Sequence, residues 1–144
     1  MEFTLEQLNE FLGKAALATY AGGGKTVDPS TPDFVSRLPG FKELEYKEKD
    51  FYYRDSYAGF FTSAGQEIVW FKGKPVWTQV YGGRMVPEFQ NEEAFAHNTF
   101  DFLKKAMSHG EKKESFQPRG EKEFKDGDWE YRCNWTGDIT SLHL

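Results

Sequence analysis

Apolar residues recur at helical spacing in two stretches of the chain. The first follows Thr4, which with Gln7 forms a capping-box pattern, and covers residues 5–20. The second follows Asn91, a residue type that caps helices well, and covers residues 92–108. The pattern therefore predicts two helices, with a long proline-containing loop at 21–42 after the first.

Most of the remaining apolar positions alternate with polar ones, as in half-buried strands. In the second of these segments Phe51, Tyr53, Asp55 and Tyr57 share one face, and Arg54 lies on the other. The predicted strands are 43–47, 50–58, 65–71, 75–82 and 128–135, with a further strand that starts at Thr140.

The dipeptide Lys72-Gly73 between two of these strands is typical of a two-residue hairpin turn. A hairpin closed there has both faces lined by apolar groups, so both faces should be covered. Its predicted cross-strand neighbours are Ile68 with Trp77, Val69 with Val76, and Trp70 with Pro75.

Two parts of the chain resemble each other. Residues 43–63 and 121–141 align without a gap at an offset of 78, and nine of 21 positions are identical, including Asp50/Asp128, Tyr53/Tyr131, Arg54/Arg132 and Gly59/Gly137. Such self-similarity indicates a repeated structural unit. The predicted fold class is α+β, one domain over 1–144 with two pseudo-repeats (about 4–83 and 91–144) of a helix followed by an antiparallel β-meander, the second truncated.

Composition narrows the classes of partner. The 144 residues suit one domain, and a net charge of −5 argues against nucleic acid as a direct partner. No stretch approaches the roughly 18 apolar residues of a membrane span, so we expect no membrane partner. The single cysteine, Cys133, and an N-terminus unlike a signal peptide predict a cytoplasmic location. The truncated second repeat leaves an open sheet edge, which predicts a homodimer or another protein partner.

No cofactor or metal is predicted. The sequence Gly22-Gly23-Gly24-Lys25-Thr26 resembles a phosphate loop, but it follows a helix and lacks the earlier glycine of that motif. The three histidines, His97, His109 and His143, do not have the spacing of metal ligands.

Two carboxylates are the candidates for catalysis. Asp55 and Glu67 with Arg54 would suit acid–base chemistry if an aromatic environment raised a carboxyl pKa. The favoured interpretation of Asp55 is a structural role, paired with an arginine or placed where the strand meets solvent. The recurrence of Arg54 as Arg132 favours a role in the fold for this arginine.

A binding site for a small molecule is the leading functional hypothesis. Tyrosine and tryptophan are abundant, and their polar ends need partners, as in an apolar pocket with a few polar groups. The predicted ligand-binding residues are Tyr53, Arg54, Tyr57, Trp70, Trp77, Gln79 and Tyr81, flanked by the loop 21–42. The alternative, which is favoured for most of these residues, is that they belong to the core.

Several segments resemble a prokaryotic family catalogued as a domain of unknown function. They are Tyr20-Ala21-Gly22, Leu44-Glu45-Tyr46, the run Asp50 to Gly59, Gly65-Gln66-Glu67, and the run Pro75 to Gly83. Members of that family sometimes follow a helix-turn-helix segment, so the resemblance implies a sensor or accessory role and no known catalytic residues. Three hypotheses follow: a ligand-binding or sensor-like domain, an enzyme using Asp55 and Glu67, and a protein-interaction module.

Overall fold

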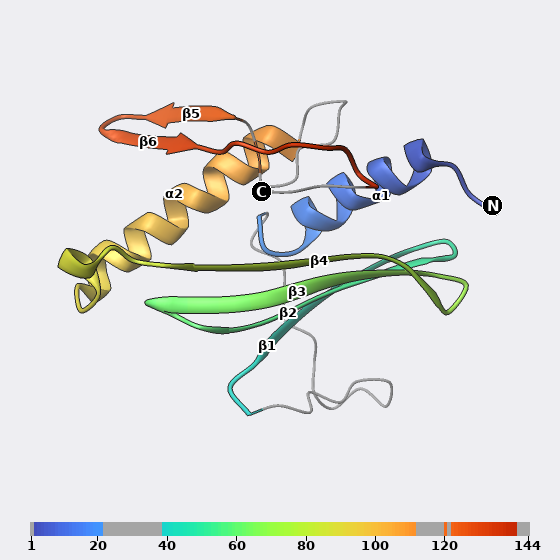
Figure 1. Cartoon of the computed structure of the whole chain (residues 1–144), viewed down its shortest axis with the longest axis horizontal. Helices are drawn as coiled ribbons and strands as arrows, with labels where there is room; N and C mark the ends of the chain where they lie inside the picture. Colours follow the sequence, from blue (N-terminus) through green and yellow to red (C-terminus); the bar gives the residue numbers. More distant parts are fainter. Residues whose placement is uncertain (1, 22–38, 112–119, 121, 141–144) are drawn as a thin grey trace. The chain divides into compact units, whose positions relative to one another are not determined.

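The computed structural model describes residues 2–21, 39–111, 120 and 122–140 (Figure 1). The chain divides into two compact units, one formed by residues 1–23 with 99–144 and the other by residues 24–98. The secondary structure is α+β, as the sequence predicted, with two helices, a four-stranded antiparallel sheet and a two-stranded sheet among the described residues.

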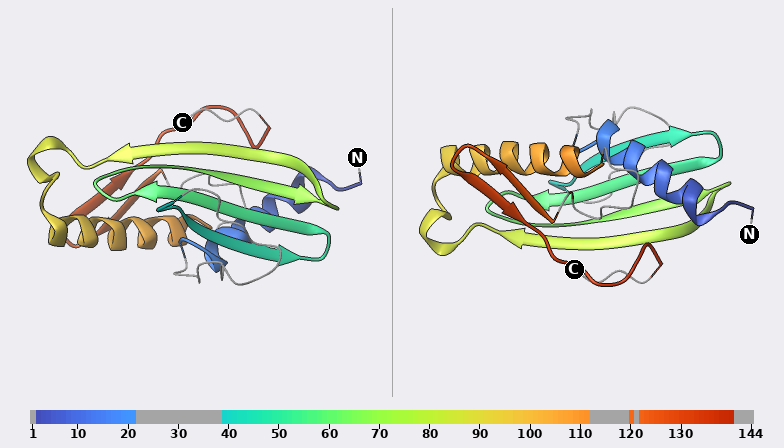
Figure 2. Two further views of the ribbon diagram at one scale, coloured as in Figure 1. Left: turned by 90° about the horizontal axis from the view of Figure 1, so that it is seen from below. Right: turned by 90° about the horizontal axis from the view of Figure 1, so that it is seen from above.

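The unit 24–98 contains the four-stranded sheet. Its strands follow one another in chain order, each antiparallel to the last, as Figure 2 shows. Such a meander needs only short connections, and the sequence supplies turns between strands of alternating polarity. The strands are β1 (Lys42–Glu48), β2 (Phe51–Gly59), β3 (Thr62–Phe71) and β4 (Lys74–Arg84).

The β3–β4 hairpin closes at Lys72-Gly73, as predicted, and both residues have positive φ, 48° and 77°. Two predicted cross-strand pairs are wrong. Ile68 lies opposite Thr78 and Val69 opposite Trp77, whereas Trp70 lies opposite Pro75 as expected. The physical reason is an irregularity between Val69 and Trp70, where the register shifts by one residue, and a shift of this kind cannot be read from turn chemistry alone.

Directly paired residues in a sheet point to the same side, so the register defines two faces. We call the side of Tyr53, Asp55 and Tyr57 the Tyr53 face, and the side of Tyr52 and Arg54 the Arg54 face. Leu44, Tyr53 and Val69 on the Tyr53 face are buried, each at most 3% exposed. The Tyr53 face therefore carries the apolar centre of the sheet.

A short 3₁₀ helix, η1 (Pro87–Phe89), connects the sheet to helix α2 (Glu93–Glu111). The ring of Phe89 stacks on Phe95 with centroids 4.2 Å apart. Phe60, at the turn between β2 and β3, contacts His97 with centroids 4.9 Å apart. These aromatic contacts hold the first turns of α2 within the same unit as the sheet.

The other unit contains α1 (Leu5–Ala18), the later turns of α2 and a small hairpin of β5 (Glu123–Asp126) and β6 (Trp129–Arg132). The Thr4 side chain accepts from the Gln7 N–H, and the Gln7 side chain accepts from the Thr4 N–H, which confirms the capping box. The Ser108 hydroxyl donates to the carbonyl of Ala21 at 2.6 Å. Phe102, only 8% exposed, packs on Trp129 of the hairpin with centroids 5.5 Å apart.

Several predicted element boundaries differ from the structure; β3, for example, starts at Thr62, three residues before the predicted 65. Helix α1 ends two residues before the predicted 20, and α2 runs three residues beyond the predicted 108. The strand predicted at 128–135 is shorter, and β5 was not predicted as a strand. Thr140 lies in a turn, and the rest of the strand predicted from it falls outside the described residues. The loop 21–42 also lies mostly outside them.

The hairpins β1–β2 and β5–β6 have the same register. Glu45 pairs with Arg54 in the first hairpin, and Glu123 pairs with Arg132 in the second, so each residue of the second pair lies 78 positions after its equivalent in the first. The turns also correspond, since Lys49 has φ 54° and Gly127 has φ 59°.

Within the described residues, no helix is long and apolar enough to cross a membrane.

Candidate functional site

Three polar side chains form a row across the Tyr53 face. Asp55 on β2 lies directly opposite Glu67 on β3, and Glu67 lies directly opposite Gln79 on β4. Directly opposed residues have Cβ atoms about 4.5–5.5 Å apart, so Glu67 neighbours both Asp55 and Gln79. Asp55 is 2% exposed, and Glu67 and Gln79 are half-buried. A buried row with two carboxylates needs hydrogen bonds or cationic partners to offset desolvation.

Tyr81 supplies one of these hydrogen bonds. Its hydroxyl donates to Oδ1 of Asp55 at 2.6 Å, across the intervening strand β3. Gly65 lies directly between Tyr57 and Tyr81 in the register. A Cβ atom at this glycine would be 2.5 Å from the Tyr81 hydroxyl oxygen and 2.6 Å from Tyr57 Cβ. The absence of a side chain at Gly65 therefore makes the room in which the Tyr81 ring crosses β3.

Two further groups on the Tyr53 face show the effect of burial. Burial raises the pKa of the Tyr57 hydroxyl, and the nearby Asp55 carboxylate raises it further. The Nε2 atom of Gln79 is buried and makes no hydrogen bond in the structure. An unsatisfied buried donor is costly, about 1–3 kcal/mol, so this amide stands out in the polar row.

The Arg54 face carries a separate polar network. The Arg54 guanidinium forms an ion pair with Glu43, whose side chain is 10% exposed. The Tyr52 hydroxyl donates to Glu45 at 2.9 Å, and the Tyr52 ring lies 5.3 Å from the Trp70 ring. Burial, followed by the hydrogen bond and the negative charge of Glu45, raises the pKa of Tyr52 to about 12.

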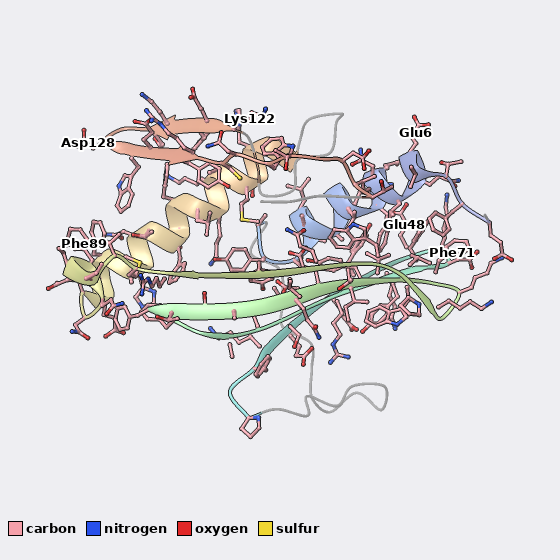
Figure 3. The ribbon with its side chains drawn as sticks, viewed as in Figure 1. Glu6, Glu48, Phe71, Phe89, Lys122 and Asp128 are labelled. Atoms are coloured by element: carbon pink, nitrogen blue, oxygen red, sulfur yellow. The ribbon has the colours of Figure 1, made fainter. Side chains whose placement is uncertain are left out.

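The sheet therefore divides the predicted site residues. The five on the Tyr53 face share that side with Asp55 and Glu67, while Arg54 and Trp70 lie on the opposite side. Figure 3 shows side chains leaving both sides of the sheet, with Glu48 and Phe71 labelled in the sheet unit. The predicted residues that share the Tyr53 face are Tyr53, Tyr57, Trp77, Gln79 and Tyr81.

Two residues of these networks were missed from the sequence. Gly65 was placed in a strand without a role, and Glu43 was not named as the partner of Arg54. A glycine inside an alternating strand is a signal of close approach, and it could have drawn attention to Gly65. No such local signal connects Glu43 with Arg54, because the contact depends on the pairing of β1 with β2. Among the described residues, no group of three or more His, Cys, Asp and Glu side chains could hold a metal ion.

The chain matches a known protein family. A family model described as a domain of unknown function, DUF5680, matches residues 55–143, which is more than half of the chain. The match begins at Asp55 on β2, and so includes Glu67, Gln79 and Tyr81. No curated protein matches the chain, and no solved structure matches it.

Proposed function

The chain belongs to the DUF5680 family, a domain of unknown function, and we propose that it is a non-enzymatic domain that binds a small polar molecule on the Tyr53 face of the sheet. The observation that carries the proposal is the row of Asp55, Glu67 and Gln79, with a buried carboxylate and an unsatisfied amide N–H among aromatic side chains. Ligand sites combine an apolar surround with a few polar groups in this way.

The chemistry of the row suggests the ligand's polar groups. Carboxylates at Asp55 and Glu67 would repel each other when both are ionised, so a hydrogen-bond donor or a cation between them would be favoured. The Nε2 atom of Gln79 would instead be satisfied by an acceptor on the ligand. A molecule with both a donor and an acceptor group therefore suits this row.

Aromatic side chains flank the row on the same face. Tyr53 precedes Asp55 and Tyr57 follows it on β2, while Trp77 and Tyr81 flank Gln79 on β4. Tyr53 is 3% exposed, and the other three are half-buried. Rings in these positions offer apolar contact and polar tips, and they would also attract a ligand cation.

A thermal-shift screen with a metabolite library tests the proposal. A ligand for this face should raise the melting temperature of the wild-type chain, and the rise should shrink for Gln79→Leu and Tyr81→Phe. Tyr52→Phe is the matched control, since it removes a tyrosine hydroxyl bonded to a carboxylate on the opposite face. If no compound acts at about millimolar concentration, or if Tyr52→Phe weakens binding as much as Tyr81→Phe, the proposal is wrong.

The pairing of Asp55 with Glu67 favours a second candidate, an enzyme that uses the two carboxylates. Neighbouring carboxylates can share one proton, so that one acts as an acid and the other as a base. Arg54 would not take part, because it lies on the other face and pairs with Glu43. Turnover of a bound compound that is abolished in Glu67→Gln, with binding retained, would support this candidate over simple binding.

We also infer that the hairpins β1–β2 and β5–β6 are copies of one ancestral unit, within a cytoplasmic sensor-like protein. Their matching register, their turn residues at positive φ, and the positive φ of both Gly59 and Gly137 support the pseudo-repeat. Replacing residues 123–132 by the sequence of residues 45–54 tests it. The chimera should keep the wild-type circular dichroism and cooperative unfolding, whereas a chain that no longer unfolds cooperatively would argue against equivalence.

A further inference from the structure

The two edges of the four-stranded sheet differ sharply in charge. Edge strands present unpaired backbone groups, and proteins commonly protect them with charged residues. In β1 five of the seven residues are charged, whereas β4 carries charge only at its ends, on Lys74 and Arg84. Residues 75–83 between them have no charge, and within the part of the chain that the structure describes, β4 pairs only with β3. The β4 edge, at the margin of the sheet in Figure 2, thus lacks the protection that β1 has.

The backbone groups that face this edge can be identified. The Met85 N–H donates to the carbonyl of Phe61 at 2.8 Å, continuing the β3–β4 register. Backbone groups alternate in direction along a strand, so Thr78, Val80 and Gly82 direct their N–H and C=O groups away from β3. The β4 edge therefore offers a regular set of donors and acceptors to another strand.

The side chains on this edge are also suited to an additional strand. Val80 is 76% exposed, the largest exposure among the exposed large hydrophobic residues described, and Val76 is 36% exposed. β-branched residues favour strand pairing through contacts across the ladder. An uncharged edge with exposed valines is the kind of surface that pairing with a second strand covers.

We propose that β4 pairs antiparallel with β4 of a second copy of this chain, about a two-fold axis at Val80. This register places Val80 opposite its own counterpart, Thr78 opposite Gly82, and Val76 opposite Arg84. An axis at Gln79 would instead place Lys74 of each copy opposite Arg84 of the other, and the repulsion between these like charges would disfavour that register. The result is a continuous eight-stranded sheet with an isologous interface.

A second copy is the partner that the strand itself supports. Antiparallel pairing of a strand with a second copy of itself is two-fold symmetric. In this arrangement the uncharged run 75–83 faces an equally uncharged run of the second copy. The open edge predicted for the second repeat, where β6 lies, is a poorer surface for this purpose. It has four residues, of which Glu130 and Arg132 are charged.

Sedimentation of matched variants tests the proposal. The 16.7 kDa wild-type chain should show a concentration-dependent shift to twice its mass up to about 1 mM. Val80→Lys should weaken this dimer at least about tenfold, because it places two ammonium groups together at the axis. Gln66→Lys is the control, since Gln66 pairs directly with Val80 on the same face but belongs to β3, which already has a partner on each side.

Hydrogen exchange gives a second measurement. The amides of Val80 and Gly82 should exchange more slowly as the wild-type concentration rises, while those of β1 should not change. A strictly monomeric wild type, or a dimer weakened equally by both lysine substitutions, overturns the proposal. A monomer that takes up an extended peptide of another protein at β4 would also overturn it. None of these results depends on ligand binding at the Tyr53 face.

Discussion

Tyr81 and Asp55, 26 residues apart in the sequence, are joined by a 2.6 Å hydrogen bond that passes over Gly65 on the strand between them. The bond connects β2 with β4, which are not neighbours in the sheet. Asp55 is almost fully buried, so the tyrosine hydroxyl offsets part of the cost of removing this side chain from water. The stability of the sheet and the arrangement of the candidate site thus depend on the same pair of residues.

Tyr81→Phe should lower the free energy of unfolding by about 1–3 kcal/mol, because it removes a hydrogen bond from a buried carboxyl group. Urea denaturation of the wild type and the variant measures the difference. Tyr52→Phe removes a comparable hydrogen bond to the half-buried Glu45, and should cost at most about 1 kcal/mol. Equal losses in the two variants would mean that the Tyr81–Asp55 hydrogen bond stabilises the chain no more than the Tyr52–Glu45 bond does.

Gly65→Ala should destabilise the chain by about 1–3 kcal/mol, since the new methyl group would overlap Tyr81 and the Cβ of Tyr57. It should also displace the Tyr81 ring and perturb the chemical shifts of Asp55. Gly83→Ala on β4 is the control, because a Cβ there meets nothing within 4 Å, and its effect should stay within about 0.5 kcal/mol. Similar effects of the two substitutions would show that Tyr81 does not need the space at Gly65.

The raised pKa of Tyr52, about 12, predicts a loss of stability at high pH. Below about pH 10 the hydroxyl is protonated in both states, and its contribution is fully present. Between about pH 10 and 12 the unfolded chain loses this proton first, so stability falls as pH rises through that window. Other groups titrate there too, so the measurement is the difference between wild type and Tyr52→Phe. From about pH 9 to 11 the free energy of unfolding should fall further for the wild type than for Tyr52→Phe. Equal losses in the two proteins would contradict a raised pKa at Tyr52.

Phe102→Ala should cost about 3–5 kcal/mol, because this 8% exposed ring of α2 packs on Phe124 and Trp129 of the β5–β6 hairpin. Phe89→Ala is the matched control. Phe89 is 38% exposed and stacks on Phe95, so its loss should cost about 1 kcal/mol. Chemical denaturation of both variants checks the contrast, and a small effect at Phe102 would mean that the hairpin contributes little to its unit.

The sequence predicted the helices and the four strands of the sheet because each has a strong local signal. Thr4 and Gln7 mark the start of α1, and Lys72-Gly73 closes the β3–β4 hairpin as expected. The predicted register of that hairpin is wrong on one side of Val69 and Trp70, because an irregularity there shifts the pairing by one residue. The turn residues give no sign of this shift. Strand β5 was missed because four residues show too little alternation to be recognised.

For the candidate site, the alternation in β2 was enough to place Asp55 with Tyr53 and Tyr57, and to place Arg54 on the other side. The position of Trp70 relative to these residues depends on the pairing of β3 with β2, which alternation within a single strand does not reveal. The pairing put Trp70 beside Tyr52 and away from the Tyr53 face. A site shared by several strands requires knowledge of sheet order, and only the folded chain provides it.

The sequence by itself determined the two helices, the positions of the four strands of the sheet and the alternation of faces within β2, because these follow from neighbours within a few positions. Only the tertiary structure decided that Asp55, Glu67 and Gln79 form one row and that Tyr81 reaches Asp55 over Gly65. The physical reason is that cross-strand contacts depend on strand order and register, which many weak interactions along the whole sheet set together.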